Sequence, residues 1–201
     1  MKLKLLFLSA LIPFGFSAFG QIKEKATPDP VESAFEVSAY AGANRYSSKE
    51  FGIEGVWKKN LQPKLYLNVG ISVAEGHTPV DRHQRARNML EIGVPVQIEL
   101  GYLSKGKSSL YGSFGLTPTL FTTLNAYQMV NHIKDKNKYG TQTGFLLTPA
   151  LEGGVNFPIN DLFLRVGIFL RYKVNCTTGG FDVYHEVAGN CFFGPKIGLI
   201  F

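Results

Sequence analysis

The chain is poor in the residues that usually carry catalysis, metal binding or membrane-spanning helices. Its 201 residues include two cysteines, one tryptophan and four histidines. Two cysteines supply too few ligands for a metal site by themselves. Beyond the N-terminal segment no run of about 18 uncharged apolar residues remains, which excludes a helix that crosses a membrane. The sequence has no glycine-rich phosphate loop and no basic tract with interleaved aromatics, so it does not indicate binding of nucleotides or nucleic acids.

The composition indicates a folded domain that is rich in turns. Hydrophobic residues make up 45% and aromatic residues 13% of the chain, which is too much for a disordered protein. The 22 glycines and 10 prolines favour many turns and argue against a helical bundle. A length of 201 residues is enough for one domain with a substantial core.

The N-terminus has the pattern of a secretory signal peptide. Two lysines precede an apolar run, and the small residues Ala18 and Gly20 stand where a cleavage site requires them. We therefore expect residues 1–20 to be removed, which leaves 19 basic and 15 acidic residues in the mature chain. The polar segment 21–33 predicts a flexible periplasmic leader, and residues 34–201 are expected to form the domain.

Hydrophobicity alternates with a period of two along eight segments of the mature chain, which is typical of β-strands. The segments are 34–43, 50–58, 64–74, 89–102, 109–122, 143–157, 162–174 and 191–201. Most of them are longer than the usual five or six residues of strands in globular domains. Such lengths suit tilted strands that cross a bilayer.

The links between these segments alternate between short and long. Short links follow the second, fourth and sixth segments, and longer links follow the first, third, fifth and seventh. Antiparallel neighbours joined in this way form an up-and-down meander, with short turns at one end and long loops at the other. In outer-membrane barrels the short turns face the periplasm, so we expect both termini on that side.

The two faces of each segment differ in polarity. In LFLRVGIFLRYKV, residues 162–174, the even-numbered positions are apolar, whereas Arg165, Arg171 and Lys173 occupy odd-numbered positions. A soluble barrel with its apolar face inward would show the same alternation. However, so many apolar residues would overfill an eight-stranded bore, the polar faces are rich in small residues, and aromatics gather near strand ends. The sequence therefore predicts an all-β fold, an eight-stranded antiparallel up-and-down transmembrane β-barrel.

With the apolar face outward, the same register places charged side chains in the bore. The acids are Glu36, Glu54, Glu91, Glu99 and Glu152, and the bases are Lys58, Arg165, Arg171, Lys173 and Lys196. Five acids and five bases are close to neutral, as a packed interior requires, because unpaired buried charge is costly. We interpret the set as a structural salt-bridge network that fills the bore, and a path for protons or ions is the alternative.

The signal peptide, the eight alternating segments and the final aromatic residue together resemble a known family. The chain resembles small outer-membrane β-barrel proteins of the OmpA/OmpX type, and more specifically the outer membrane β-barrel domain and PorT-like proteins of Bacteroidetes. One face of the last segment looks like the C-terminal β-signal of such families: Phe193, Ile197, Leu199 and Phe201. The resemblance covers residues 34–201. It implies an outer-membrane location and insertion by the barrel-assembly machinery, but it transfers no catalytic residue.

Two further groups of residues lie at the predicted outer ends of the strands. Cys176 and Cys191 flank the last long loop on the outward face and are candidates for a disulfide, with two free thiols as the alternative. The loops also carry cations suited to lipopolysaccharide phosphates or a surface partner, with simple solvation as the alternative. These cations are Arg82, Arg85, Arg87, Lys134, Lys136 and Lys138.

The sequence predicts a non-enzymatic outer-membrane protein without cofactor or metal, which serves envelope structure or binds through its surface loops. Its expected partners are the lipid bilayer, the barrel-assembly machinery and, at the loops, lipopolysaccharide or a surface partner. One alternative is an outer-membrane hydrolase that modifies lipids, for which Ser72 and His77 lie near the appropriate end. Another alternative is a soluble periplasmic barrel that binds a ligand as lipocalins do.

Overall fold

The structure is a computed structural model, and it describes the larger part of the chain. The described residues are 31–44, 47–78, 85–103, 106–130, 133–135, 143–176 and 191–201. Among the described residues, no helix is long and apolar enough to cross a membrane. The predicted signal peptide, residues 1–20, and the first ten residues of the predicted leader lie outside the described residues.

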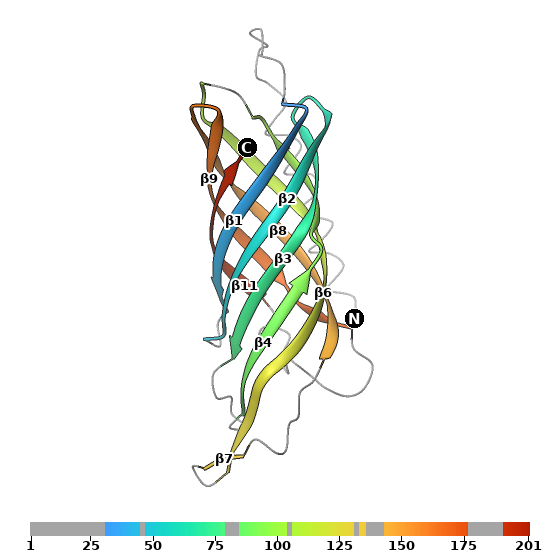
Figure 1. The fold of residues 1–201 in the computed structure, drawn as a ribbon, viewed down its shortest axis with the longest axis vertical. Helices are drawn as coiled ribbons and strands as arrows, with labels where there is room; N and C mark the ends of the chain where they lie inside the picture. Colours follow the sequence, from blue (N-terminus) through green and yellow to red (C-terminus); the bar gives the residue numbers. More distant parts are fainter. Residues whose placement is uncertain are drawn as a thin grey trace, which may run out of the picture.

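The strands close into a single antiparallel ring (Figure 1). Their bounds are β1 (Ser33–Ala43), β2 (Lys49–Gln62), β3 (Leu65–Thr78), β4 (Arg85–Gly93), β5 (Val96–Gly101), β6 (Ser109–Val130), β7 (Ile133–Asp135), β8 (Thr143–Ile159), β9 (Leu162–Tyr172), β10 (Val174–Asn175) and β11 (Cys191–Ile200). The ring runs through β1, β2 and β3, then through β4 and β5 as two parts of one strand, and then through β6, β8, β9 and β11, which pairs with β1. The predicted eight-stranded antiparallel barrel is confirmed.

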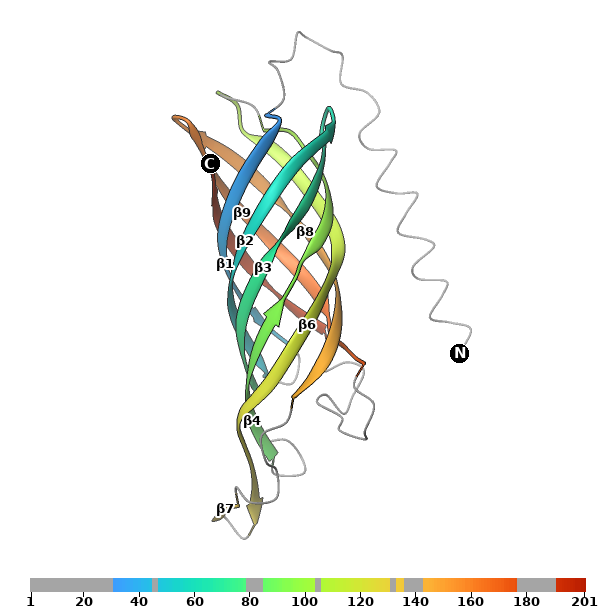
Figure 2. The same cartoon turned by 45° about the vertical axis from the view of Figure 1, so that its right-hand side comes forward.

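The short turns between β2 and β3 and between β8 and β9 lie at one end of the barrel, and the strand ends that lead into the long links lie at the other (Figure 2). The turns that join β2 to β3 and β8 to β9 contain Lys64 and Asn160, whose positive φ values of 73° and 55° allow the chain to reverse tightly. The first and last strands meet at this same end, where Phe35 and Phe201 exchange backbone hydrogen bonds of 3.2 and 2.9 Å. The described ends of the chain therefore lie together at the short-turn end.

The predicted strand 89–102 differs from the structure at two points. It begins earlier, at Arg85, and it is interrupted at Val94 and Pro95, between β4 and β5. Proline has no N–H to donate, so the ladder of hydrogen bonds cannot run through it unbroken. The wall stays closed because the Val94 N–H donates to the Pro118 carbonyl at 3.0 Å and the Pro95 carbonyl accepts from the Gly70 N–H at 3.1 Å.

The predicted strand 109–122 is longer in the structure, where β6 continues to Val130 and turns back into β7. Most of this continuation, from Asn125 onward, was predicted as part of the long link that follows the fifth segment. β4 pairs with it as far as Arg85, which lies opposite Gln128. The β4–β6–β7 sheet therefore extends past the ring at the long-loop end, as the lower part of Figure 1 shows.

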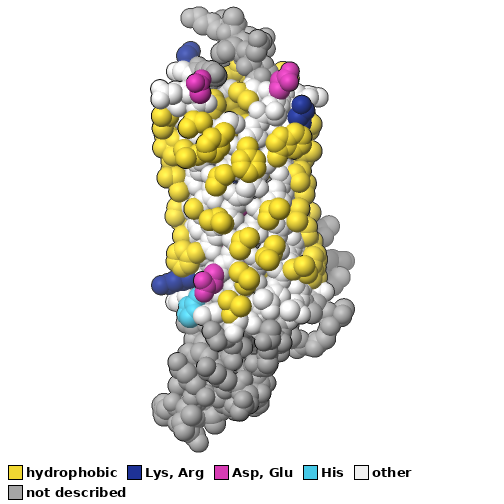
Figure 3. Space-filling view, in the orientation of Figure 1, with side chains coloured by type: hydrophobic (Ala, Val, Ile, Leu, Met, Phe, Trp, Pro, Cys, Tyr) yellow, Lys and Arg dark blue, Asp and Glu magenta, His cyan; other side chains and the backbone are white. Residues whose placement is uncertain are grey.

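The outer surface of the ring is a belt of apolar side chains (Figure 3). In this view the apolar side chains occupy the middle of the barrel, and charged side chains of the described residues lie near its two ends. Val37, Ile71 and Ile168, from β1, β3 and β9, are 47%, 62% and 55% exposed, respectively. The outward direction of the apolar face, on which the choice of a membrane barrel depended, is therefore as predicted.

Inward-facing glycines make room for aromatic rings from neighbouring strands. A Cβ atom at Gly52 would overlap the ring of Tyr40, its cross-strand partner. A Cβ atom at Gly42 would lie 2.7 Å from the ring of Phe169, closer than carbon atoms approach. The small residues of the polar faces thus have a packing role, because they accept the rings that fill the bore.

Two apolar clusters occupy the interior near its two ends. Near the long loops the cluster consists of Tyr40, Ala74, Met89, Phe121, Leu146, Phe169 and Phe192. At the short-turn end it consists of Ala34, Tyr66, Leu103, Phe163 and Ile200. Both clusters place their apolar side chains among the inward-facing polar residues, so polar and apolar side chains share the interior.

The close contact between Gly52 and the Tyr40 ring predicts that one added methyl group at Gly52 destabilises the barrel. Gly52→Ala should lower the free energy of unfolding by about 1–3 kcal/mol, because overpacking forces the ring of Tyr40 to move. The matched control is Gly112→Ala, since the nearest atom to a Cβ there is the Glu152 carbonyl oxygen at 3.9 Å. Urea unfolding of the refolded barrel, followed by tryptophan fluorescence, measures both, and equal losses would contradict the packing role.

Candidate functional site

The bore contains a dense set of charged side chains. All ten residues that the sequence analysis assigned to the bore are at most 7% exposed. The structure adds Glu50, which is 1% exposed and was missed, although it shares the even-numbered positions of Glu54 and Lys58 on β2. The described residues therefore bury six carboxylates and five cations in the interior.

Arg165 and Lys58 bind two carboxylates in the half of the bore near the short turns. Arg165 forms a bidentate pair with Glu99, with Nη1 and Nη2 at 2.9 and 2.6 Å from the two oxygens, and its Nη1 lies 3.1 Å from Glu36. Lys58 Nζ lies 2.8 Å from Glu36 and 2.6 Å from Glu99. The amide of Asn68 donates a further hydrogen bond of 2.8 Å to Glu99. Each carboxylate thus has two cationic partners.

Lys196 and Arg171 bind the carboxylates in the middle of the bore. Lys196 Nζ lies 2.6 Å from Glu54 and 2.8 Å from Glu152. Arg171 donates to the other oxygen of Glu54 and lies 3.6 Å from Glu152. A contact of 4.0 Å between Lys196 Nζ and Glu36 joins this group to the ion pairs near the short turns.

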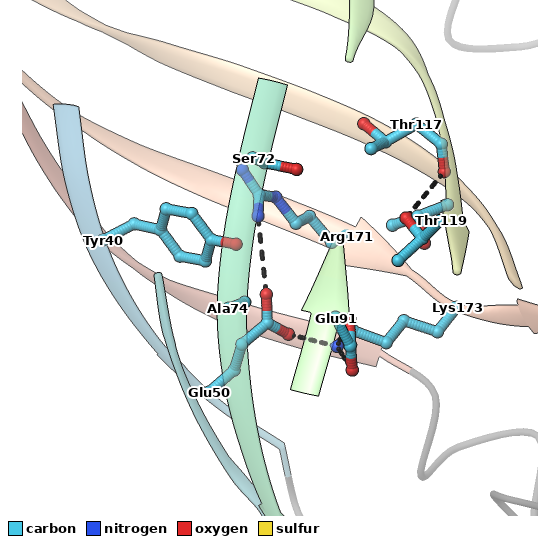
Figure 4. Close-up of a pocket in the computed structure, with 10 residues that line it drawn as sticks. Tyr40, Glu50, Ser72, Ala74, Glu91, Thr117, Thr119, Arg171 and Lys173 are labelled. Atoms are coloured by element: carbon cyan, nitrogen blue, oxygen red, sulfur yellow. Dashed lines mark hydrogen bonds and ion pairs between the residues drawn. The ribbon is translucent and has the colours of Figure 1, made fainter. Parts of the chain in front are cut away.

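Lys173 lies between the two carboxylates nearest to the long loops. Its Nζ is 2.6 Å from Glu50 and 2.7 Å from Glu91, and both carboxylates point toward it (Figure 4). Arg171 Nη1 lies 3.4 Å from Glu50 and so links this group to the middle of the bore. The ion pairs therefore form one connected network along the bore, from Glu99 near the short turns to Glu91 near the long loops.

Aromatic rings cover the guanidinium groups where carboxylates do not. The Arg165 guanidinium carbon lies 3.8 Å from the centroid of the Tyr111 ring, and that of Arg171 lies 4.0 Å from the centroid of the Tyr40 ring. These distances are those of cation–π contacts, which are strongest where water is absent. Because Gly52 accepts the ring of Tyr40, the glycine positions and the charge network depend on each other.

The packed network leaves very little free volume around it. A cavity of about 10 Å³, which is room for one water molecule, lies among the side chains near the long loops. Its walls are Tyr40, Glu50, Ser72, Ala74, Glu91, Thr117, Thr119, Thr148, Arg171 and Lys173 (Figure 4). The charged side chains of the network therefore occupy the bore in the described part of the barrel.

Ser72 and His77, the two residues considered for a lipid hydrolase, lie on opposite faces of the barrel wall. Ser72 is 6% exposed and faces the bore, whereas His77, five residues along the same strand, faces outward. The His77 Nδ1 atom lies 2.6 Å from the Asn88 side-chain oxygen instead. Within the described ranges, no group of three or more His, Cys, Asp or Glu side chains is placed to hold a metal ion.

The candidate disulfide is not formed, and Cys176 and Cys191 are both free thiols. Cys191 lies opposite Tyr172 of β9, whereas Cys176 lies four residues further along, beyond the end of β9, where its N–H donates to Phe145 of β8. Four extended residues span about 13 Å, more than the roughly 4.4–6.8 Å between Cα atoms that a disulfide allows. Strand parity places both thiols on the outward face but does not give their heights along the barrel, so the sequence left both a disulfide and two free thiols open.

The predicted loop cations divide into two groups. Arg85 and Arg87 belong to β4 and Lys134 belongs to β7, so these three are strand residues at the long-loop end. The other three lie outside the described residues: Arg82, Lys136 and Lys138.

The four residues of the proposed β-signal lie on the outward face of β11 and at the residue that follows it. Phe193, Ile197, Leu199 and Phe201 are 56%, 53%, 41% and 56% exposed, respectively. Pro195 lies between them on the same face, and its register opposite Ile168 is kept. An unbroken apolar stripe therefore runs along the strand that closes the ring.

Comparisons with known proteins support the fold. No protein-family model and no curated protein matches the sequence. Among solved structures, the N-terminal β-barrel domain of Pseudomonas aeruginosa OprF is 14% identical, with a TM-score of 0.46 over 86% of this chain and 100% of that chain. Neisserial surface protein A (NspA) is 11% identical, with a TM-score of 0.48 over 84% and 94% of the two chains. The outer membrane enzyme PagL is 11% identical, with a TM-score of 0.50 over 82% and 97%.

At such low identities the likeness extends to the fold alone. The class that the fold defines is the small outer-membrane β-barrel, and the chain has the architecture of that class.

The contacts of Lys58 predict a difference between two adjacent lysines. Lys58→Met should lower the free energy of unfolding by about 3–5 kcal/mol, because it removes a cation from two buried carboxylates. Lys59→Met should change it by less than about 0.5 kcal/mol, since Lys59 is exposed on the outward side. The folded fraction in urea, read from the gel migration of unboiled samples, measures both. A similar loss in both variants would mean that the network does not contribute to stability.

Proposed function

We propose that the protein is an integral, non-enzymatic outer-membrane barrel that strengthens the envelope and binds a partner through its long-loop end. The observation that carries the proposal is the division of polarity between the two sides of the wall. Charged side chains are buried in ion pairs within the bore, while aliphatic side chains such as Ile71 and Ile168 are exposed outside. This division is the reverse of a soluble barrel and suits a wall surrounded by lipid.

The positions of the chain ends support export through the periplasm. The described ends of the chain lie together at the short-turn end, which faces the periplasm in the proposed orientation. A signal peptide over residues 1–20 would direct export. The apolar stripe of β11, ending at Phe201, would then be read by the barrel-assembly machinery. Membership of the Bacteroidetes outer membrane β-barrel domain or PorT-like family is part of this proposal and rests on the same features.

The filled bore supports a structural role over transport or enclosure of a ligand. The ion pairs run along the bore, and the cavity of about 10 Å³ beside them has room for one water molecule. A lipocalin-like barrel would need an interior cavity large enough for its ligand. The separation of Ser72 from His77 by the wall also favours a non-enzymatic role over a lipid hydrolase.

The long-loop end is the proposed binding surface. The β4–β6–β7 sheet extends past the ring there and carries Arg85, Arg87 and Lys134. Guanidinium groups bind phosphate through two parallel hydrogen bonds, so a cationic rim suits the phosphates of lipopolysaccharide. In the proposed orientation this end faces the cell exterior, where lipopolysaccharide lies.

Membrane insertion has a direct test. We expect the protein in the outer-membrane fraction, with faster gel migration before boiling than after it, because the folded barrel resists SDS. Val166→Arg should reduce the folded membrane form, since a cation in the middle of the belt costs about 2–4 kcal/mol. Leu61→Arg, at an exposed position near the short turns, should be tolerated and serves as the control. Recovery of the wild-type protein in the soluble periplasmic fraction would contradict the proposal.

Binding at the rim has a matched test with equal changes of charge. Replacing Arg85, Arg87 and Lys134 together by alanine should weaken binding to vesicles that contain lipopolysaccharide by about tenfold or more. The control replaces Lys59, Lys64 and Lys107, which are exposed at the short-turn end. Co-sedimentation of the purified protein with vesicles measures the binding. Equal weakening by both triple variants would show that net charge matters and the rim does not.

A further inference from the structure

A groove crosses the outer wall on β4, β6 and β8, in the half of the barrel near the long loops. It has a volume of about 320 Å³ and is lined by Leu90 and Ile92 of β4, residues 120–122 of β6, and Thr143 and Gly144 of β8. It is separate from the charged bore, because most of its lining comes from outward-facing positions. It is also much larger than the cavity of about 10 Å³ inside the barrel.

The register of the strands explains why the wall is hollowed here. Leu120 lies opposite Ile92 on one side and Phe145 on the other, and the next residue, Phe121, lies opposite Gly144. Gly144 has no side chain, and the Phe121 ring packs inward in the apolar cluster near the long loops. The floor of the groove therefore lies at the backbone of the wall, and the aliphatic side chains around it form its sides.

The chemistry of the lining suits a long apolar ligand with a polar end. Three aliphatic residues, Leu90, Ile92 and Leu120, supply the apolar side chains of the groove, and the paired residues Thr122 and Thr143 lie at the end nearest the long loops. At ~30 Å³ for each group, about the volume of a water molecule in the liquid, the groove has room for roughly ten methylene groups. That volume corresponds to much of one acyl chain.

The position of the groove in the apolar belt indicates where such a ligand comes from. Ile92 is 50% and Leu120 is 66% exposed, so the groove is continuous with the surface that faces lipid in the proposed function. We propose that the groove is a binding site for one acyl chain of a lipid in the leaflet at the long-loop end. This inference rests on the proposed membrane location, and it adds a specific lipid site to the cationic rim.

The strand β4 continues from the groove toward the long-loop end. From Leu90 the strand runs through Arg87 to Arg85 toward the long-loop end, and Arg87 is about 10 Å beyond Leu90 at 3.3 Å per residue. A lipid whose chain lies in the groove has its head group near the level of Thr122 and Thr143.

Two substitutions on the same strand test the site. Leu120 and Leu110 both face outward on β6 and are 66% and 67% exposed, but only Leu120 lines the groove. Leu120→Trp fills the groove with an indole ring, and Leu110→Trp makes the same chemical change elsewhere in the belt. Ile92→Trp is a second groove variant in case Leu120→Trp does not fold, and the gel migration of unboiled samples reports folding.

Native mass spectrometry of the folded protein in detergent, titrated with either phosphatidylethanolamine or lipid A, counts the bound lipid. We expect the wild type and Leu110→Trp to retain one lipid, and the groove variants to need about tenfold more lipid for the same occupancy. Binding of both lipids supports recognition of the acyl chain, which they share. Binding of lipid A alone would show that the head group is recognised instead and would contradict the proposal. Loss in Leu110→Trp equal to that in the groove variants, or no bound lipid on the wild type, would overturn the proposal. Because folding and membrane fractionation are scored separately, failure of this site is distinguishable from failure of the membrane location.

Discussion

Each cation in the bore binds carboxylates that belong to other strands. Arg165 on β9 binds Glu99 on β5 and Glu36 on β1, so a single side chain ties together three parts of the wall that are distant in sequence. A buried charge that lacks such a partner costs several kcal/mol. A slip of one residue in any strand would turn its charges outward and its aliphatic residues inward. The register of the whole ring therefore depends on pairing across the bore, and the structure permits few alternatives.

The same pairing explains the other features of the interior. The two arginines have planar guanidinium groups, and the rings of Tyr40 and Tyr111 lie against them. These rings need space in a narrow bore, and glycine supplies it, as at Gly52. The polar interior consequently has little room for water, and the apolar residues that would fill a soluble core lie outside. This arrangement suits a wall that is surrounded by lipid.

Likeness to known barrels at 11% identity has a simple physical basis. The fold requires alternation of polarity, long strands and short turns at one end, and many sequences meet these conditions. Activity does not follow from the shared fold, because function depends on particular sites. In this protein two features depart from a uniform wall: the β4–β6–β7 sheet extends past the ring, and the groove on β4, β6 and β8 interrupts the apolar belt.

The sequence by itself determined the number of strands, their order, their two faces and ten of the eleven buried charges, because a strand alternates with a period of two whatever its neighbours are. Glu50 follows the same alternation and was available from it. Only the tertiary structure decided which charges meet, how far β6 extends, and that Cys176 and Cys191 lie at different heights. Heights, pairings and the outer groove depend on the relative position of strands around a closed ring. That position is set by contacts between residues far apart in sequence, which the pattern of a single strand does not contain.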